Sequence, residues 1–359
     1  MAEAVTAREL LRLREYTQRI HPASNGAVAA TVQHLLALQA QDFANALWAV
    51  GLRTTGSTRS DVLESLEHGE VVRSLPMRGT LHFVAAEDLR WMLALTSART
   101  LQAAKSRFEN LGLDAATLER SASIASDALA GGAMSRDEFM TLLAGNGIPP
   151  EGQRGYHVIF YLAQLGLVCW GPPSGTQQAL VLVDDWIPTQ TLPARDAALA
   201  GFALRYFGGH GPATERDFAW WTKLTLADVR AAMFSCGTDL TELTLRGTSY
   251  WIATTELEAA STGTTGAAVH ALPGFDEFLL GYQDRSLSLS AEHSNRIVPG
   301  NNGIFLPLIT ARGRIVGTWR RTPKSVTARI EPLHFDEASA PAHAGFARAA
   351  RAYSRFTTG

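Results

Sequence analysis

The stretch Val71–Val84 reads VVRSLPMRGTLHFV and contains two short apolar runs around a turn. Residues 71–75 and 80–84 are rich in Val, Leu, Thr and Phe, which favour strands. Pro76-Met77-Arg78-Gly79 lies between them and predicts the turn. Helical patterns precede this hairpin: a capping box at Thr6-Ala7-Arg8-Glu9, an apolar run over 27–38 and a short helix over 61–67. Helices followed by a hairpin are the element order of a winged helix.

The same order recurs twice further along the chain. A capping box at Ser135-Arg136-Asp137-Glu138 opens the second block, which continues with a helix over 156–165 and strands over 167–170 and 179–183. The third block has predicted helices over 199–206, from 212–217 and over 226–234, then strands over 240–245 and 250–253. Repeated helix-helix-hairpin blocks predict tandem winged-helix units, and such units read the grooves of duplex DNA.

From Ala268 onward, short apolar runs alternate with Gly, Pro and Asn, which predicts a β-rich, barrel-like module closed by a helix over 341–354. We therefore expect an α+β fold. The predicted division is winged helix 1 (1–95), winged helix 2 (96–195), winged helix 3 (196–262) and a β-rich module with a DNA-contacting hairpin (263–359).

The charge of the chain is nearly balanced, with a formal net charge of −2 and a pI near 6.6. This balance argues against a simple polycationic DNA binder. Lys105, Lys223 and Lys324 are the only lysines among 32 basic residues, although a GC-rich gene would give the same arginine excess. Between Asn295 and Ile330 the chain carries seven basic residues and no Asp or Glu, so this strip creates a local positive field.

Several classes of site lack their signatures in the sequence. Cys169 and Cys236 are the only cysteines, which argues against a disulfide framework and against a cysteine-based zinc site. The chain contains no P-loop, G-x-S-x-G or H-E-x-x-H motif, and its histidines show no metal-ligand spacing. We therefore expect no metal and no cofactor. Without a transmembrane run or a signal-peptide pattern, the sequence predicts no membrane association and a cytoplasmic location.

The most unusual local sequence is Leu38-Gln39-Ala40-Gln41-Asp42. In an extended segment, residues i and i+2 project from one face, so Gln39 and Gln41 could point together into a groove. The alternative is that both are solvated, since glutamine is a good helix former. Asp42 is the competing candidate for a base, but it would lie on the opposite face, and we expect it to act as a helix cap or in an ion pair.

A second acidic candidate is the adjacent pair Asp276 and Glu277. These residues could be catalytic carboxylates, but adjacent side chains point in opposite directions. We expect at least one of them to pair with an arginine such as Arg78 or Arg285.

Five motifs occur together in order: Gln39-Ala40-Gln41, Met77-Arg78-Gly79-Thr80-Leu81-His82, Gly211-Pro212-Ala213-Thr214, Leu272-Pro273-Gly274-Phe275-Asp276-Glu277-Phe278-Leu279-Leu280-Gly281-Tyr282 and Val316-Gly317-Thr318-Trp319-Arg320-Arg321. This set, spanning nearly the whole chain, resembles the winged-helix DNA glycosylases of the AlkZ/YcaQ type. The resemblance implies a C-shaped scaffold of tandem winged helices around duplex DNA. It also implies that Gln39 and Gln41 are catalytic, because the AlkZ branch carries Gln-apolar-Gln where its sister branch carries Gln-apolar-Asp.

The resemblance further implies a monofunctional glycosylase without a lyase step. Its substrates would be bulky N7-alkylguanines in double-stranded DNA, with unhooking of interstrand crosslinks and self-resistance to a DNA-alkylating antibiotic as further expectations. A C-shaped protein could surround DNA as a monomer. Two amides suit this chemistry, since an N7-alkylated guanine is already cationic and a good leaving group. The enzyme then needs to orient water and face dipoles toward the developing sugar cation.

The candidate DNA-binding residues lie on two hairpins. Arg312 and Arg314 stand at a predicted turn that suits a DNA groove, the alternative being a solvated turn. We expect Trp319 in the core and one of Arg320 and Arg321 facing outward. The final list of candidates is Arg78, His82, Arg312, Arg314, Arg320 and Arg321, with a structural histidine as the alternative for His82.

Two other functions remain open from the residues alone. The main alternative is a winged-helix transcription regulator without catalytic activity. A hydrolase for non-DNA substrates that uses Asp276 or Glu277 is weaker, because the arginine-rich strip would then have no purpose.

Overall fold

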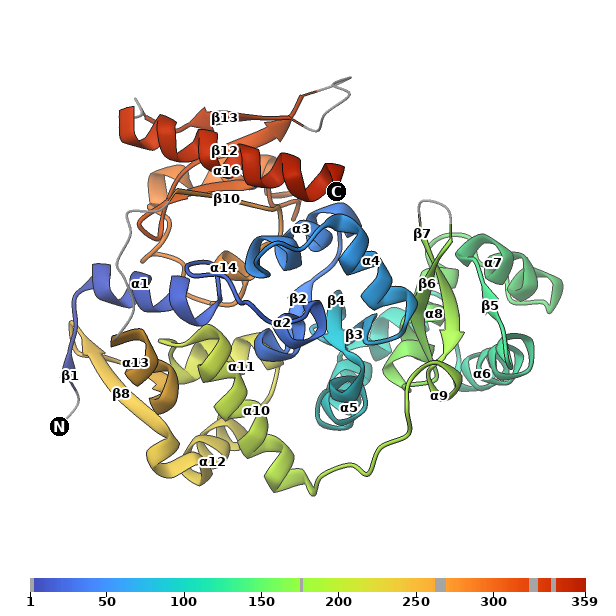
Figure 1. The fold of residues 1–359 in the computed structure, drawn as a ribbon. Helices are drawn as coiled ribbons and strands as arrows, with labels where there is room; N and C mark the ends of the chain where they lie inside the picture. Colours follow the sequence, from blue (N-terminus) through green and yellow to red (C-terminus); the bar gives the residue numbers. More distant parts are fainter. Residues whose placement is uncertain (1–2, 175–176, 262–268, 323–328, 337–339) are drawn as a thin grey trace. The chain divides into compact units, whose positions relative to one another are not determined.

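The computed structural model has a mixed α+β fold and describes residues 3–174, 177–261, 269–322, 329–336 and 340–359 (Figure 1). It divides into two compact units. Unit 1 comprises residues 1–62, 199–221 and 225–359, and unit 2 comprises residues 63–198 and 222–224. Helix α4 (Arg59–Glu67) begins in unit 1 and ends in unit 2, whereas α10 (Arg195–His210) begins in unit 2 and ends in unit 1.

Unit 1 contains both ends of the chain. Its other elements are β1 (Glu3–Ala4), α1 (Ala7–Thr17), α2 (Val28–Leu35), β2 (Ala37–Gln39), α3 (Phe43–Arg53), α11 (Glu215–Thr222), α12 (Leu226–Cys236), β8 (Leu240–Leu245), β9 (Thr248–Ala253), α13 (Thr254–Ser261), β10 (Val269–Leu272), α14 (Glu277–Leu280), α15 (Ser294–Ile297), β11 (Leu308–Ala311), β12 (Arg314–Arg321), β13 (Ile330–His334) and α16 (Ala340–Thr358). Unit 2 consists of β3 (Val71–Met77), β4 (Thr80–Ala85), α5 (Ala86–Asn110), α6 (Ala115–Leu129), β5 (Ala133–Met134), α7 (Arg136–Gly145), α8 (Arg154–Gln164), β6 (Val168–Ser174), β7 (Gln177–Leu182) and α9 (Val183–Trp186).

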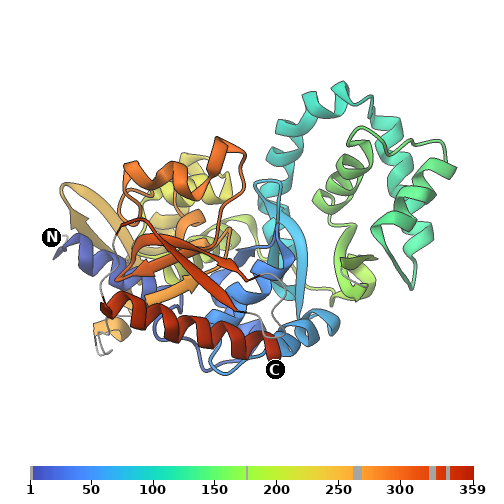
Figure 2. The same ribbon diagram turned by 90° about the horizontal axis from the view of Figure 1, so that it is seen from above.

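The predicted barrel-like module is an open sheet, which corrects the expectation of a barrel. Strands β10, β11, β12 and β13 pair antiparallel in chain order, and within the described residues β10 and β13 do not pair to close the sheet. Helix α16 packs along this sheet instead (Figure 2). Gly345 permits the close approach, since a Cβ there would lie 2.5 Å from Val269. A covering helix thus buries the apolar face that a barrel would enclose.

The local elements follow the sequence pattern closely in all three helix-hairpin blocks. Both predicted capping boxes are present, at Thr6–Glu9 and Ser135–Glu138. The hairpin predicted around Arg78 is β3–β4, and the third predicted hairpin is β8–β9. Some boundaries are wrong: the strand expected to end at residue 170 continues to Ser174 as β6, and the helix expected over 199–206 spans Arg195–His210. The helix expected to reach Leu38 ends at Leu35, because Leu36 adopts a positive φ of 64° and the chain becomes β2.

Each unit has its own apolar core. In unit 2, α5, α6, α7 and α8 pack with the hairpin β6–β7 around Phe139, Leu143 and Val158, which are fully buried. In unit 1, the segment from β10 to β12 packs against α1 through Leu11 and Leu272. Leu38 and Ala40, on either side of Gln39, are buried in unit 1 as well.

Candidate active site

The segment Gln39-Ala40-Gln41 lies between β2 and α3 in unit 1. Its burial alternates: Gln39 is half-buried, Ala40 is fully buried and Gln41 is exposed. This alternation is what an extended chain gives, with Ala40 anchored in the core and both amides on the accessible side. Asp42 is the N-cap of α3 and accepts a 2.9 Å hydrogen bond from the Asn45 N–H, so the expected capping role is confirmed.

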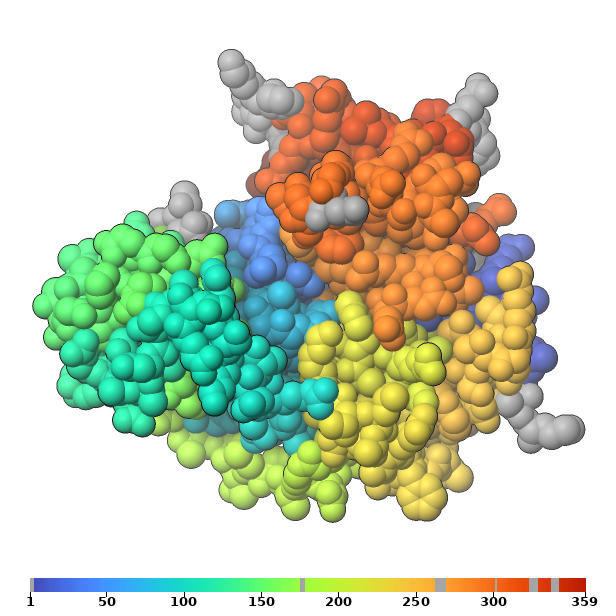
Figure 3. All heavy atoms as spheres, turned by 180° about the vertical axis from the view of Figure 1, so that it is seen from behind, coloured from blue at the N-terminus to red at the C-terminus, as the bar shows by residue number. Residues whose placement is uncertain are grey.

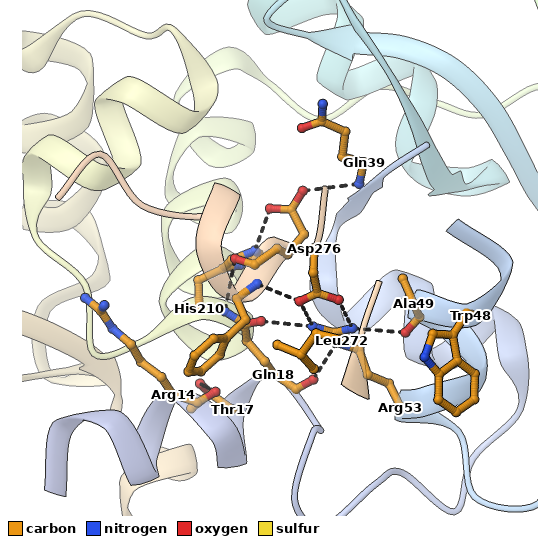
Figure 4. Close-up of polar contacts among 12 residues, drawn as sticks. Arg14, Thr17, Gln18, Gln39, Trp48, Ala49, Arg53, His210, Leu272 and Asp276 are labelled. Carbon is orange, nitrogen blue, oxygen red and sulfur yellow. Dashed lines mark hydrogen bonds and ion pairs between the residues drawn. The ribbon is translucent and has the colours of Figure 1, made fainter. Parts of the chain in front are cut away.

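Glu277 supports this segment from below. Its Oε1 accepts a 3.2 Å hydrogen bond from the backbone N–H of Gln39, and its Oε2 accepts a 2.9 Å bond from Trp221 Nε1. The carboxylate is buried, with 1% of the residue exposed, and lies 3.6 Å from His210 Nε2. In Figure 4 the Gln39 side chain extends away from the buried cluster, so the acid holds the backbone and leaves the amide available.

A buried ion pair lies directly beneath this acid. Asp276 and Arg53 form a bidentate pair at 2.7 and 2.9 Å, and both side chains are 0% exposed. Arg53 also donates to the backbone oxygen and the side-chain oxygen of Gln18, at 3.0 and 3.1 Å (Figure 4). The expectation that an acid of this pair meets an arginine is confirmed, but the partner is Arg53 rather than Arg78 or Arg285.

The two proposed partners of the acidic pair have other roles. Arg285 donates to the carbonyl of Leu279 at 3.1 Å and lies over the rings of Trp220 and Phe305. Arg78 belongs to unit 2. Sequence spacing could not identify Arg53, because it is more than 200 residues from Asp276 in the chain.

Close backbone packing explains the glycines around the acidic pair. A Cβ on Gly281 would lie 2.8 Å from the His210 ring, and one on Gly209 would lie 2.7 Å from the His34 carbonyl oxygen. The Tyr282 hydroxyl donates to the His210 carbonyl at 2.7 Å and ties α10 to the same cluster. Asp276 also caps α14, accepting from the Phe278 N–H at 2.9 Å. These contacts fix the position of Glu277, whose supporting role the sequence did not reveal.

Arg78 and His82 lie together on the β3–β4 hairpin of unit 2. Arg78 donates to His82 Nε2 at 2.9 Å, and His82 Nδ1 lies 2.7 Å from the Thr80 carbonyl oxygen. An imidazole that accepts at Nε2 and donates at Nδ1 is neutral, which assigns its tautomer. His82 is fully buried, so the structure supports the structural alternative for this residue, with Arg78 as the group it orients.

Arg312 and Arg314 are exposed on the β11–β12 turn, but the turn itself is docked. Gly313 between them is buried, and a Cβ there would lie 2.6 Å from the Leu11 Cβ. Burial raises the pKa of the Glu15 carboxyl on α1, and the Gly313 backbone beside it opposes that rise. The tip of this turn therefore rests on α1, and its two arginines flank it.

Arg320 and Arg321 lie at the far end of β12. Arg320 pairs with Glu331 on β13 at 3.3 Å, an exposed ion pair, and Arg321 lies over the Tyr353 ring at 5.8 Å. Trp319 is buried as expected, while both arginines are exposed. The segment from Asn295 to Ile330 contains no acid, but Arg320 in it pairs with Glu331, the next residue after this segment, on the neighbouring strand. Lys324 lies outside the described residues.

The basic candidates do not form one cluster. Arg314 and Arg321 are the first and last residues of the eight-residue strand β12, which places them roughly 20 Å apart. Arg296, also in the basic strip, bonds to the Phe335 carbonyl at 2.8 Å and lies over that ring. Within the described residues the strip therefore consists of two exposed arginine pairs, the exposed Arg329 and one arginine engaged in packing.

The described residues contain neither a metal-binding cluster nor a membrane-spanning helix. No group of three or more His, Cys, Asp or Glu side chains is placed to hold a metal ion there. None of the helices in the described ranges has both the length and the apolarity needed to cross a membrane.

Comparison with known proteins points to one kind of enzyme. The sequence pattern of the family described as "DNA glycosylase AlkZ-like" matches residues 32–356. A curated protein of Streptomyces sahachiroi, the "Interstrand DNA cross-link repair glycosylase", is 25% identical over 325 residues, which is 87% of each chain. A solved structure, "Streptomyces sahachiroi DNA glycosylase AlkZ", shares the fold with a TM-score of 0.83 and 22% identity, covering 98% of this chain and 97% of the other.

Proposed function

This chain belongs to the AlkZ-like DNA glycosylase family, and we propose that it hydrolyses the N-glycosidic bond of bulky N7-alkylguanines in duplex DNA. Gln39 and Gln41 are the proposed catalytic residues. The observation that carries the proposal is the glutamine segment itself: a buried acid fixes its backbone, and its two amides lie outside the core.

The chemistry follows from what an amide can do. A glutamine cannot take a proton at neutral pH, but its carbonyl accepts a hydrogen bond and its NH2 donates one. Gln39 and Gln41 would orient a water molecule toward the anomeric carbon and face dipoles toward the oxocarbenium-like sugar. The cationic base leaves without protonation. Unmodified guanine lacks that positive charge, so the same two amides do not release it.

Rigidity of the segment is part of the proposed mechanism. The hydrogen bond from the Gln39 N–H to Glu277 and the buried Ala40 side chain hold the backbone on both sides of the amides. A preorganised polar group lowers a barrier because it needs no reorganisation during the reaction. Glu277 is 1% exposed, so we assign it to positioning rather than to activation of water.

Contacts to the DNA backbone are proposed for the exposed arginines. Arg312 and Arg314 beside the docked turn, Arg320 and Arg321 at the end of β12, and Arg78 in unit 2 present guanidinium groups that suit phosphate. Because the β11–β12 tip rests on α1, we assign Arg312 and Arg314 to phosphate contact rather than to groove insertion. His82 would act through Arg78.

The wider expectations extend this proposal. The helix-helix-hairpin blocks would be winged-helix units bounded as predicted at 1–95, 96–195 and 196–262, with 263–359 as the β-rich part and a C-shaped arrangement around DNA. The name of the Streptomyces sahachiroi relative supports unhooking of interstrand crosslinks. Self-resistance to an alkylating antibiotic, action as a monomer and a cytoplasmic location complete the proposal.

A panel of defined duplexes tests the reaction. Each duplex carries one N7-guanine adduct (methyl, a bulky monoadduct or an interstrand crosslink), and an unmodified duplex is the control. We expect release of the modified base and an abasic site from the bulky adducts, measured by mass spectrometry and alkaline cleavage. Tight duplex binding without any released base would instead support the transcription-regulator alternative.

A further inference from the structure

Unit 2 contains a cavity that the glutamine segment does not share. Its volume is about 550 Å³, within the usual range of small-molecule sites. The β3–β4 turn, α5, α8 and the residue after α11 form its walls. The lining residues are Arg78, Gly79, Arg99, Thr100, Ala103, Ala104, Tyr156, His157, Phe160 and Lys223.

Every charged group in this lining is a cation. Arg78, Arg99 and Lys223 come from three separate parts of the chain, and none of these lining residues is Asp or Glu. Burial and the neighbouring charges of Arg78 and Arg99 lower the pKa of Lys223, which shows that the three groups share one field. Three cations around one cavity repel one another, and an anion bound between them would relieve that repulsion.

The backbone holds two of these cations in uncommon conformations. Arg78 and Lys223 have φ values of 56° and 62°, a region that side-chain-bearing residues seldom adopt. Arg78 and Gly79 together form the positive-φ pair of a tight hairpin turn, a position where Asn or Asp is the usual choice. His82 then fixes the Arg78 guanidinium from behind. The hairpin therefore keeps Arg78 in an unfavourable backbone conformation that places its charge at the cavity.

Aromatic side chains also line the cavity. Phe160 lies under the hairpin turn, where a Cβ on Gly79 would approach its ring to 3.1 Å. Tyr156 is one turn earlier on α8, is 39% exposed and packs edge-on against His157 at 5.2 Å. Thr100, Ala103 and Ala104 on α5 are small, so the space beside these rings stays open. The exposed Tyr156 ring beside three cations fits a base joined to a phosphate.

We propose that this cavity is a nucleotide subsite for DNA, in which Arg78, Arg99 and Lys223 bind a phosphodiester and Tyr156 stacks on the attached base. Unit 2 belongs to the part of the chain that the family pattern covers, and the inference rests on the proposed function only in taking DNA as the substrate. The site serves strand binding and is separate from the glutamine chemistry. It would therefore change affinity for DNA rather than the rate of base release.

Figure 3 shows one face of the unit 2 surface in teal and green. The cationic wall is tested by salt-dependent binding to an undamaged duplex. The variant Arg99→Gln/Lys223→Gln is compared with Lys105→Gln, which removes an exposed charge from the same helix α5 but does not line the cavity. We expect the logarithmic salt slope to fall by about one for the double variant. The slope of Lys105→Gln stays at the wild-type value.

The aromatic wall needs its own readout. Tyr156→Ala should weaken binding about fivefold or more while leaving the salt slope unchanged, because stacking on a base is not an ionic contact. Tyr156→Phe keeps the ring and should retain wild-type affinity. A duplex or short single strand that contains 2-aminopurine reports stacking directly, through quenching that Tyr156→Ala relieves.

Three results would overturn the assignment. Equal salt slopes for the double variant and Lys105→Gln would show that Arg99 and Lys223 do not contact a phosphate. Wild-type affinity and wild-type quenching in Tyr156→Ala would show that no base stacks on Tyr156 and that the cavity contacts only the phosphate backbone of DNA. Tight binding of dGMP that these variants abolish, with DNA binding unaffected, would make the cavity a free-nucleotide site. Thermal melting of each variant controls for folding. These assays measure DNA binding and not base release, so their outcome does not depend on whether the glycosylase proposal is correct.

Discussion

Replacing Glu277 by glutamine is the sharpest test of how the site is built. Glu277 offers two acceptor oxygens to two donors, the Gln39 N–H at 3.2 Å and Trp221 Nε1 at 2.9 Å. A glutamine has one acceptor oxygen and one NH2 group. In Glu277→Gln, one of the two donors must therefore face another donor inside a site with almost no access to water.

The expected cost follows from these contacts. Losing a charge-assisted hydrogen bond and leaving a buried donor unmatched costs about 1.5–3 kcal/mol. Removing a buried charge lowers the desolvation penalty and offsets part of this cost. We expect the free energy of unfolding to fall by about 2 kcal/mol. If the Gln39 backbone shifts, kcat for base release should fall about tenfold or more, because displacements near 1 Å cost up to ~100-fold in rate.

Urea unfolding and single-turnover base release on an N7-alkylguanine duplex measure the two effects of Glu277→Gln. Glu258→Gln is the matched control, since Glu258 is exposed on α13. Duplex affinity should stay near the wild-type value, which separates positioning of Gln39 from DNA binding. Wild-type stability together with wild-type kcat in Glu277→Gln would refute the assigned role of this carboxylate.

Three further predictions concern stability. Asp276→Asn leaves the fully buried Arg53 without its counter-charge and should lower the free energy of unfolding by about 3 kcal/mol or more; a change below 1 kcal/mol in urea unfolding would contradict the buried pair. Burial raises the pKa of Glu15 to about 7, against the opposing effect of the Gly313 backbone. The folded state thus binds this proton more tightly than the unfolded state, and the stability gained below about pH 4.5 is lost as the pH rises through 7. Unfolding series from pH 5 to 8 should show this loss in the wild type but not in Glu15→Gln, and parallel curves would reject it. Gly313→Ala combines a φ of +74° with a 2.6 Å approach to Leu11, whereas Gly247→Ala has a φ of +78° and open space. Thermal melting should therefore show the larger loss for Gly313→Ala, about 2–3 kcal/mol against about 1 kcal/mol, and equal losses would mean that the turn is not docked.

Local structure was predictable from the sequence because its signals are local. The capping residues Thr6 and Ser135, the turn at Arg78-Gly79 and the bounds of β8 each depend on a few neighbouring residues. The helix over 27–38 was drawn too long, since nothing in its apolar periodicity marks the positive φ at Leu36. The open sheet was mistaken for a barrel because strand patterns do not show which edges pair.

The support of the candidate site depends on long-range contacts that spacing cannot reveal. The sequence singled out Gln39, Gln41 and the pair Asp276-Glu277, but not the link between them, which spans 238 residues. Arg53 gave no signal either, since it ends an apolar helix and resembles an ordinary helix-terminal arginine. The acid-free strip was visible, but its cross-strand partner Glu331 lies just outside it. Predicting this ion pair requires the register between β12 and β13, which the sequence does not give.

Base release by Gln39→Ala/Gln41→Ala tests the central claim most directly. The wild type and this double variant are each given a duplex with a single bulky N7-alkylguanine, and the free modified base is quantified over time under single-turnover conditions. The account predicts that release falls to the spontaneous rate of the labile adduct while duplex affinity and melting temperature stay near wild type. Release at the wild-type rate from the double variant would contradict the assignment of the chemistry to these two amides.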